Sequence, residues 1–448
     1  MDGWPEGLPP LGPPTAPGTP PVAVAVLPNG LTVWVVRRTG VPLVTLRLSV
    51  LAGRVFDPVE APGLAALVAA GLKEGTAHRS SSEVNELLQS AGAELATAAG
   101  DDVLEAVATG LAARLEVLVD ALADVVTAPA FPARDVARVK SLAREELATN
   151  SSEPAFLARR AFRRAVYGDH PYSVVSPTEA SIDAVTPESL RVEAARRLVP
   201  GRALLLAVGD VEPAHAIDLA ARHFGAWRGA GSPPVEPATA SAPSGPREIL
   251  VLPRPGSVQT QLVVGQLGLT RRDADADALS LLVTIYGGAF SSRLVSNLRE
   301  EKGYTYSPGA IASFSRWRGT VRTAAAVRNE VTGAALNEIL YEMNRLATTA
   351  VSLEELARGA GRDLGLLALR GETNASLANE LAHFWLHGLG PEERSRQAAA
   401  LLRLEAPDLT RAARRSLGTG SAHIVAVGDI ATLREELSPF GPLRVIQE

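Results

Sequence analysis

The chain of 448 residues contains no cysteine. This absence excludes disulfide bonds, thiol nucleophiles and metal sites with cysteine ligands, but it does not fix the compartment. No apolar run reaches the roughly 18 residues that a membrane-spanning helix needs, so we expect no membrane span. A strong excess of one charge is missing too, since the formal net charge is -5. The chain therefore has no electrostatic field that would attract nucleic acid, and we expect no nucleic-acid partner.

The first four residues, MDGW, lack the basic and then apolar start of a secretory signal. Residues 5–21 (PEGLPPLGPPTAPGTPP) are rich in proline, and we interpret residues 1–21 as a flexible arm that cannot pack. Such an arm often lies between a removed signal or lipid anchor and a folded domain. This composition favours the periplasm or cell envelope over the cytoplasm.

The remaining composition, 46% hydrophobic and 21% charged residues, is typical of a globular protein with more than one core. Residues 229–246 (GAGSPPVEPATASAPSGP) read as a linker with almost nothing to bury. We therefore predict an N-terminal domain over residues 22–228 and a C-terminal domain over residues 247–448.

In the first half, Asn29-Gly30 between two β-rich runs predicts a hairpin. Ser80 and Glu83 have the spacing of a helix-capping box. Further strands and apolar-periodic helices alternate along the chain, which predicts a mixed sheet with helices packed on it. The expected strands cover residues 22–27, 31–36, 43–51, 93–99, 103–109 and 203–210, and the expected helices cover 61–76, 80–91, 111–126, 132–149, 154–167, 187–198 and 211–224.

The second half repeats this order of elements. The clearest repeat is AVGD at residues 207–210 and again at 426–429, roughly 220 residues later. In both places an apolar strand comes before the repeat and a helix follows it. The sequence therefore predicts a duplicated unit.

The segment Ala61–Thr76 (APGLAALVAAGLKEGT) is an apolar, helix-like run that ends at Gly75. It resembles the metal helix of the M16 (pitrilysin and mitochondrial-processing-peptidase) metallopeptidases, in which a frame like G-L-A-H-x-x-E-H-x-x-x-x-G-T carries the zinc motif H-x-x-E-H. In this frame Ala66, Ala69 and Ala70 stand where the family has His, Glu and His. Methyl groups supply neither zinc ligands nor a base. The resemblance implies a subunit that cannot cut a peptide bond by itself.

The family's third zinc ligand is a glutamate on a later helix that resembles E-R-x-x-V-x-x-E-I. Glu146 matches the ligand position, whereas Val139 replaces the helper glutamate. A single carboxylate without two imidazoles does not hold zinc against water. We therefore expect Glu146 to be a solvated helix residue and expect no metal or other cofactor in this chain.

A second block, GGAFSSRL at residues 287–294 followed by LREEKGYTYS at 298–307, resembles the M16 C-terminal signature G-G-x-F-S-S-R-L and R-E-x-x-G-x-x-Y. In two-subunit members the arginine and tyrosine of this signature reach over the zinc site of the partner. By resemblance these residues are Arg299 and Tyr306. A guanidinium and a phenol hydroxyl can stabilise the charge that peptide hydrolysis builds on the carbonyl oxygen. The alternative is a surface arginine paired with Glu300 or Glu301.

Two further patterns in the sequence suggest other kinds of site. Gly287 and Gly288 could suggest a phosphate loop, but no G-K-[ST] or G-x-G-x-x-G follows a strand, so a helix-end or close-packing role fits better. Glu380, His383 and His387 share one face of a predicted helix. One helix rarely presents three converging ligands, and we interpret this segment as packed rather than metal-binding.

The resemblance implies an α+β protein of two homologous M16-type domains, each a mixed, mainly antiparallel sheet flanked by helices, and together half of a clam-shaped dimer. It implies a non-catalytic M16B-type subunit that pairs with a separate zinc-holding H-x-x-E-H subunit, with an unfolded peptide enclosed between them. A structural scaffold, or a peptide-binding module without a proteolytic role, is the alternative. Leu95 stands where the family usually has an asparagine near the substrate edge strand.

Overall fold

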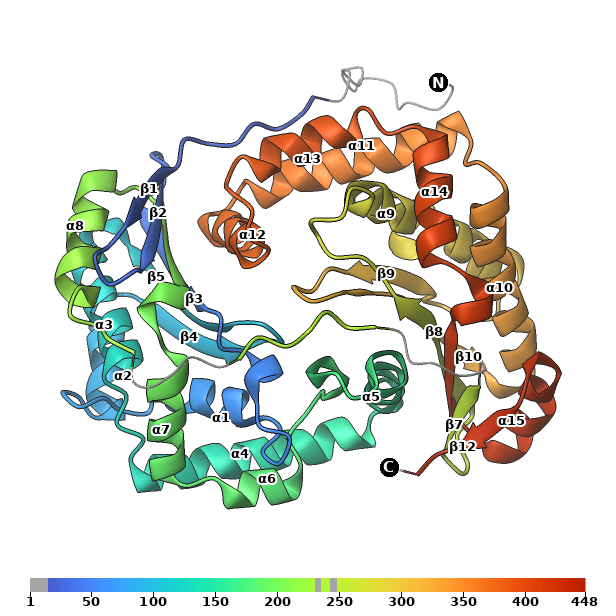
Figure 1. Cartoon of the computed structure of the whole chain (residues 1–448), viewed down its shortest axis with the longest axis horizontal. Coiled ribbons are helices and arrows are strands. Elements are labelled where there is room, and N and C mark those ends of the chain that lie inside the picture. The colour runs from blue at the N-terminus through green and yellow to red at the C-terminus, as the bar shows by residue number, and fades with distance from the viewer. Residues whose placement is uncertain (1–14, 230–234, 242–247, 448) are drawn as a thin grey trace.

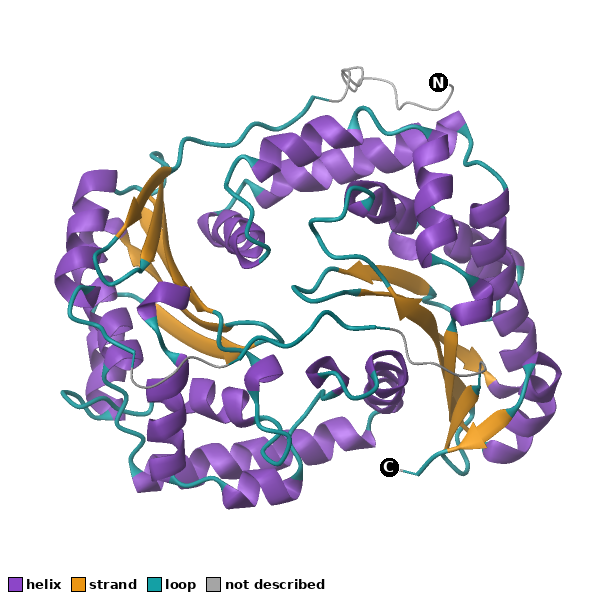
Figure 2. Cartoon of the chain, in the orientation of Figure 1, coloured by secondary structure: helices purple, strands orange, loops and turns teal. Residues whose placement is uncertain are grey.

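The computed structural model describes residues 15–229, 235–241 and 248–447. Two six-stranded sheets lie on opposite sides of the molecule, and most of the helices cover their outer faces (Figures 1 and 2). The described part of the chain contains no helix that is both long and apolar enough to cross a membrane.

The first sheet has the spatial order β1-β2-β6-β3-β5-β4, in which only β2 and β6 are parallel. Its strands are Ala23–Val26 (β1), Thr32–Arg37 (β2), Leu43–Val50 (β3), Glu94–Ala99 (β4), Leu104–Leu111 (β5) and Ala203–Gly209 (β6). The helices of this half are Leu64–Gly71 (α1), Ser81–Ser90 (α2), Leu115–Thr127 (α3), Ala133–Ser152 (α4), Pro154–Tyr167 (α5), Glu179–Ala184 (α6), Pro187–Arg197 (α7) and Pro213–Phe224 (α8).

The second sheet has the order β12-β7-β11-β8-β10-β9, with three antiparallel and two parallel pairs. Its strands are Ile249–Pro253 (β7), Gln259–Leu267 (β8), Gly309–Ser313 (β9), Thr320–Arg328 (β10), His423–Gly428 (β11) and Leu443–Val445 (β12). The helices are Ala276–Val283 (α9), Thr332–Thr348 (α10), Leu353–Arg370 (α11), Asn374–Leu386 (α12), Glu393–Leu401 (α13), Ala406–Ser416 (α14) and Ile430–Leu437 (α15), with π-helical segments at Thr284–Gly288 and Val295–Glu301.

Apart from the edge strands β1 and β12, which differ in direction, the two sheets have equivalent topologies, and this confirms the predicted α+β architecture with two similar units. One AVGD tetrapeptide lies at the end of β6 and the other at the end of β11, and each runs into the turn that follows its strand. Both strands are third in the order of their sheets. In each copy the alanine packs into the core under its own helices, and the valine packs on the opposite face of the sheet. The short helix α6 and the edge strand β12 were not predicted from the sequence.

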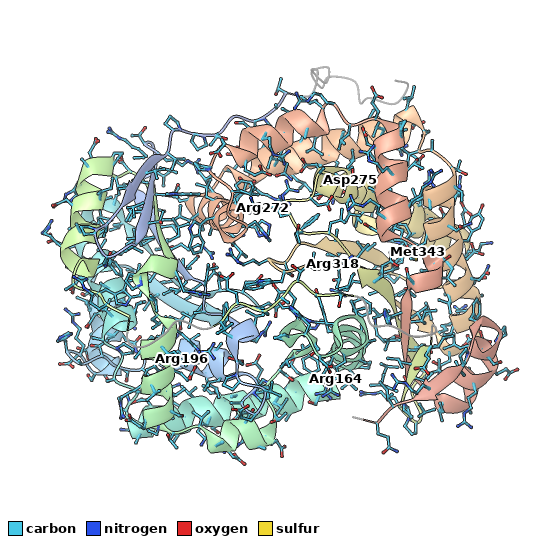
Figure 3. All side chains as sticks on the ribbon, in the orientation of Figure 1. Arg164, Arg196, Arg272, Asp275, Arg318 and Met343 are labelled. Atoms are coloured by element: carbon cyan, nitrogen blue, oxygen red, sulfur yellow. The ribbon has the colours of Figure 1, made fainter. Side chains whose placement is uncertain are left out.

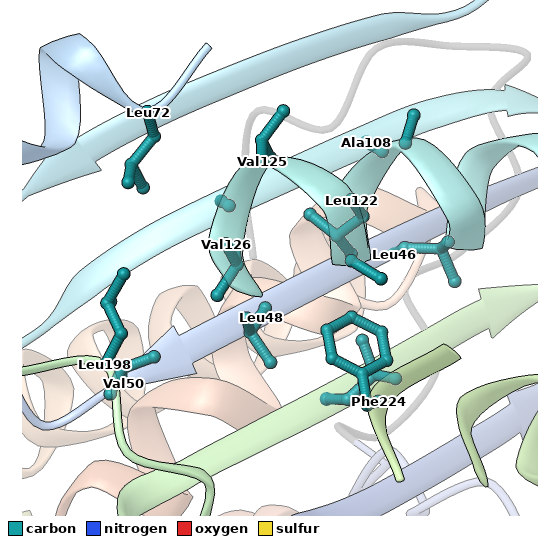
Figure 4. Packing of buried hydrophobic residues seen from close by; sticks show 14 of the residues in the cluster. Leu46, Leu48, Val50, Leu72, Ala108, Leu122, Val125, Val126, Leu198 and Phe224 are labelled. Carbon is teal, nitrogen blue, oxygen red and sulfur yellow. The ribbon is translucent and has the colours of Figure 1, made fainter. Parts of the chain in front are cut away.

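The core of the first half shows why these residues form a layered structure. Leu46, Leu48 and Val50 alternate along β3 and pack against the apolar face of α3, while Phe224 on α8 fills the adjacent space (Figure 4). All are almost completely buried. The capping box predicted at Ser80 is also present, because its side chain accepts a hydrogen bond from the backbone N–H of Glu83.

The opposite face of each sheet is covered by a helix from the other half of the chain. Helix α5 packs its apolar residues, such as Phe162, on Leu252 and Val263 of the second sheet. Helix α12 packs Leu381 on Leu206 and neighbouring residues of the first sheet. Figure 1 shows both helices on the inner sides of the sheets, where α5 packs on β8 and β11 and α12 packs on β3 and β6. The two halves therefore exchange one helix each.

We expected the arm and the linker to be unpacked, but the end of the arm and part of the linker contact the folded part of the chain. The side-chain hydroxyl of Thr19 lies 2.7 Å from that of Ser395, and the carbonyl of Gly18 accepts a hydrogen bond from Arg394, so the end of the arm is held on α13. In the linker, Ala240 is buried and its N–H donates to the carbonyl of Trp317 at 3.1 Å. Residues 1–14, 230–234 and 242–247 of these two predicted segments lie outside the described residues.

A buried carboxyl group also joins the halves. Asp102 accepts hydrogen bonds from the Tyr172 hydroxyl and, at 3.3 Å, from the backbone N–H of Arg316 in the second half. Burial is the largest cause that raises the pKa of Asp102 to about 6, and the charge of Asp101 adds to it, although these two hydrogen bonds act in the opposite direction.

This raised pKa predicts a pH-dependent stability. Because the folded-state pKa of Asp102 lies above the value of 3.8 expected in the unfolded chain, its contribution is full below pH 3.8 and is lost as the pH rises through about 6. Between pH 4 and pH 7, we expect the free energy of unfolding to fall by about 2 kcal/mol more in the native protein than in Asp102→Asn. Urea unfolding at several pH values measures this difference. An equal pH dependence in the two proteins would contradict the prediction.

Candidate functional site

The alanine positions predicted at the degenerate zinc motif border a cavity of about 450 Å³. Ala66 and Ala70 on α1 line it, together with Glu146 on α4 and Thr97 on β4. We call this space the alanine cavity. Ala69 does not line it, because its side chain is 1% exposed and belongs to the core of the first half. Of the four predicted zinc-site positions, the structure therefore brings three to one cavity and leaves Ala69 outside it.

Helix α1 starts at this place because of Gly63 and Asp57. Gly63 has φ 85°, a left-handed conformation that suits glycine, and a Cβ there would collide with Pro177. The carboxylate of Asp57 accepts hydrogen bonds from the N–H groups of Gly63 at 2.8 Å and Ala65 at 2.9 Å. These bonds satisfy donors in the first turn of the helix, so the helix is capped although its own sequence is wholly apolar.

The residues around the alanine cavity do not fit zinc. Glu146 is exposed, and Glu74, the other carboxylate of the lining, forms an ion pair with Arg138. No histidine lines the cavity, and zinc needs several nitrogen, sulfur or carboxylate ligands in a closed geometry. Among the residues that the structure describes, no group of three or more His, Asp or Glu is placed to hold a metal ion.

Arg299 lies between two aromatic rings of the second block. Its guanidinium carbon is 4.7 Å from the centre of the Phe290 ring and 4.6 Å from that of Tyr306. Both rings face solvent, since Phe290 is 71% and Tyr306 is 79% exposed. The Arg299 Nε also lies 3.2 Å from a carboxylate oxygen of Glu300. We call Phe290, Arg299 and Tyr306 the arginine sandwich.

The local fold explains the exposure of Tyr306. Arg299 belongs to the π-helical segment Val295–Glu301, which ends before Gly303, a residue with φ 64°. The buried Thr305 hydroxyl donates to the carbonyl of Ala326 at 2.6 Å and so fixes the next loop to β10. Tyr306 follows this anchor directly and extends outward.

The rest of the signature is structural. A Cβ on Gly287 would lie 2.7 Å from Ala310 and Leu294, so this glycine permits close packing, as predicted. Arg293 donates two hydrogen bonds to Glu355 on α11, at 2.7 and 3.0 Å. The hydrogen bond from Arg293 is the largest cause that lowers the pKa of Glu355 to about 2. These contacts hold the base of the arginine sandwich in place.

The alanine cavity and the arginine sandwich do not form one site. Every residue that lines the alanine cavity belongs to the first half of the chain, and the two signature residues Arg299 and Tyr306 are not among them. A role for the arginine and tyrosine at a zinc site therefore requires a site on another chain.

The two histidines at the C-terminal end of α12 differ in exposure, because His387 is buried whereas His383 is exposed. Glu380 forms a buried ion pair with Arg394, and the rings of His383 and His387 lie 4.7 Å apart. Burial is the main cause that lowers the pKa of His387 to about 3, so this ring is neutral near pH 7. The carboxylate that could have joined them is committed to Arg394.

Phe290 is the residue that reasoning from the sequence missed. It stands in the quoted signature between Gly288 and Ser291, but its partnership with Arg299 depends on how the π-helical segment folds back. An aromatic residue among small polar residues and glycines was the available signal.

The different orientations of Ala69 and Ala70 predict different tolerance to a carboxylate. Ala69→Glu would bury a charge in the core, and we expect it to lower the free energy of unfolding by about 3 kcal/mol or more. Ala70→Glu places the same group one residue later, in the alanine cavity, and should cost about 1 kcal/mol or less. Urea unfolding of both variants tests this. If both variants lost a similar free energy of unfolding, the prediction would be wrong, and Ala69 and Ala70 on α1 would have similar surroundings.

Comparison with known proteins identifies the family. The family model described as "Insulinase (Peptidase family M16)" matches residues 32–175, and the one described as "Peptidase M16 inactive domain" matches residues 184–360. Among the relatives is an uncharacterized zinc protease of Mycobacterium tuberculosis, 27% identical over 373 residues, with 82% of this chain and 85% of the relative covered. Another, from Mycobacterium leprae, is 29% identical over 64% of each chain.

Solved structures agree with this result. The crystal structure of a peptidase M16 inactive domain from Pseudomonas fluorescens aligns with a TM-score of 0.84 and 26% identity, and covers 91% of this chain and 98% of that one. A protease from Helicobacter pylori aligns with a TM-score of 0.86 at 17% identity, over 92% of this chain and 100% of that one, which shows the shared fold. The chain therefore belongs to peptidase family M16, as a member without the H-x-x-E-H zinc motif.

Proposed function

We propose that this protein is the non-catalytic subunit of a heterodimeric M16B-type zinc endopeptidase. The arginine sandwich carries this proposal, because it presents a cation and an exposed phenol in a chain whose own H-x-x-E-H positions hold only methyl groups. Exposed aromatic surface of this kind marks binding sites. The partner subunit would carry H-x-x-E-H, the zinc and the catalytic base.

The chemistry of the pair suits such a role. Hydrolysis of a peptide bond places negative charge on the carbonyl oxygen, and preorganised donors stabilise that charge. The two flanking rings restrict the Arg299 guanidinium, and its terminal NH2 groups carry further N–H donors besides the Nε that faces Glu300. The exposed Tyr306 side chain supplies a second donor, its hydroxyl group.

Peptide binding is supported by the edge of the first sheet. Strand β4 is an edge strand, and its Thr97 lines the alanine cavity. Unpaired N–H and C=O groups of an edge strand can pair with an extended peptide. Leu95, on the same strand, is half-buried against the core, so the asparagine usual in the family is replaced by a packing residue.

A peptide-binding module without a protease partner is the second candidate. The size of the alanine cavity favours it, since about 450 Å³ remain open beside an edge strand although no zinc ligands are present. A purely structural scaffold explains the exposure of the arginine sandwich less well. For either candidate the periplasm or cell envelope is our proposed location, on the basis of the proline-rich arm.

The heterodimer predicts that Arg299 affects catalysis by another chain. We expect Arg299→Ala to lower kcat/KM for a quenched fluorescent peptide by about 100-fold or more, when the full chain is mixed with the M16 subunit from the same organism that carries H-x-x-E-H. Tyr306→Phe removes only the hydroxyl and should have a smaller effect in the same direction.

The matched control is Arg328→Ala, an exposed arginine paired with Glu330 at the end of β10. It should leave activity and assembly unchanged. Size-exclusion chromatography separates loss of catalysis from loss of assembly. Full activity of Arg299→Ala in the assembled complex would refute the donated-residue role, and hydrolysis by this chain alone would refute the non-catalytic role.

A further inference from the structure

A small cavity between the two halves has an unusual excess of positive charge. Its volume is about 140 Å³, and it lies between α5 of the first half and β9 and β10 of the second. Arg159, Arg163 and Arg322 line it together with a single carboxylate, Asp101, and several hydroxyl groups. We call it the arginine cavity. Figure 3 shows the region, where Arg164 is labelled on α5 and Arg318 near the centre of the molecule.

The single carboxylate of the arginine cavity, that of Asp101, already accepts hydrogen bonds from two arginines. An Asp101 oxygen accepts a hydrogen bond from Arg54 at 2.8 Å, and its other oxygen accepts one from Arg163 at 2.7 Å. Burial alone would raise the pKa of Asp101, but the charges of Arg163 and Arg54 hold it below its usual value. Asp101 therefore stays ionised and saturated by these two partners.

Arg159 and Arg322 have no such partner. Within the described ranges, neither guanidinium forms an ion pair or a side-chain hydrogen bond, although Arg159 lies 5.3 Å from the Phe156 ring. Although the Arg159 side chain is exposed, partial desolvation and then the charge of Arg163 lower the pKa of its guanidinium. Burial is also the main cause that lowers the pKa of Arg322, with the charges of Arg159 and Arg163 adding to it. The chain holds like charges together at a cost in stability.

The backbone brings the three arginines of the cavity close together. Arg159 and Arg163 are one turn apart on α5, a spacing at which like charges repel. Arg322 lies on β10 opposite Gly265 of β8, where a Cβ would come within 2.8 Å of the Arg322 Cα. Ser313 and Thr320, which face each other across β9 and β10, bring hydroxyl groups to the same cavity. Guanidinium and hydroxyl donors that converge in this way suit an oxyanion with two or more oxygens.

The position of the arginine cavity relates it to the site described above. Arg159 lines both this cavity and the alanine cavity. A peptide that lies along β4 in the alanine cavity would therefore reach Arg159 with one end or with one side chain. The volume of about 140 Å³ is enough for a carboxylate and a short part of its side chain.

We propose that the arginine cavity binds one carboxylate of the bound peptide, held by Arg159 and Arg322. This rests on the peptide binding in the proposed function. The carboxylate is either the C-terminal group of the peptide or an aspartate or glutamate side chain. The cavity thereby gives this subunit a role in selecting the peptide, separate from any donation of Arg299 to a partner.

The first test uses acetate and the full chain alone. At constant ionic strength, replacing chloride by acetate should raise the Tm of the native protein and of Arg164→Met, which changes an exposed arginine on α5 outside the cavity. Arg159→Met and Arg322→Met should lose this shift. The exposed position of Arg159 makes its variant a safeguard if Arg322→Met does not fold. An equal acetate shift in all four proteins, or none in the native protein, would overturn the inference.

The second test identifies the source of the carboxylate. Fluorescein-labelled unstructured peptides of one sequence are compared by fluorescence anisotropy, with a free or amidated C-terminus and with one internal Glu or Gln. We expect either amidation of the C-terminus or the change of the internal Glu to Gln to weaken peptide binding by about tenfold or more. This difference in affinity should disappear in Arg322→Met and in Arg159→Met, and it should remain in Arg164→Met. Amidation identifies the C-terminal group as the ligand, and Glu→Gln identifies a side chain.

The remaining outcomes separate this inference from the proposed function. If all peptides bind with equal affinity whatever their charge, the carboxylate site is refuted and peptide binding stands. If no peptide binds although acetate still raises the Tm selectively, peptide binding is refuted, and the assignment of the carboxylate to a peptide falls with it.

Discussion

The burial of both faces of each sheet is the constraint on which the rest of the structure depends. Strand β6 alternates its side chains between two cores, with Leu205 under the helices of its own half and Leu206 under α12 from the other half. Strand β11 does the same with Ala426 and Val427. Neither half supplies enough helices to cover both faces of its own sheet. The exchanged helices α5 and α12 therefore hold the halves together through apolar contact, and they also bring Arg159 beside β10.

The possible chemistry of the chain is distributed over two places that differ in character. The alanine cavity lies beside the edge strand β4, and α1 presents the methyl groups of Ala66 and Ala70 to it. The arginine sandwich keeps its functional groups and exposes them to solvent. The two rings restrict the Arg299 guanidinium, whose ion-pair partner within its own chain is the neighbouring Glu300.

Much of the fold follows from local signals in the sequence. Asn29-Gly30 and the Ser80 capping box act over a few residues, and both predicted elements are present. The AVGD repeat pointed to equivalent strands because the tetrapeptide has the same packing on both faces in each copy. The helix exchange could not be predicted in this way, since the apolar face of α5 indicates that it is buried but not which sheet buries it.

The candidate site was predictable in its residue types but not in its geometry. The motif frame located Ala66, Ala70 and Glu146, which line one cavity, whereas the inward turn of Ala69 depends on how α1 rotates against the core. The Phe290 contact depends on how the nearby π-helical segment folds. The arginine cavity arises between segments far apart in the chain, so no local pattern predicts it.

The helix exchange has a consequence for the covalent connection between the halves. Because each half wraps a helix around its neighbour, cleavage of the backbone between α8 and β7 would leave two fragments interlocked rather than two free domains. After folding, the contacts of α5 and α12 would hold the two halves together without the covalent connection. In this respect the molecule is similar to a dimer in which each subunit places one helix on its partner.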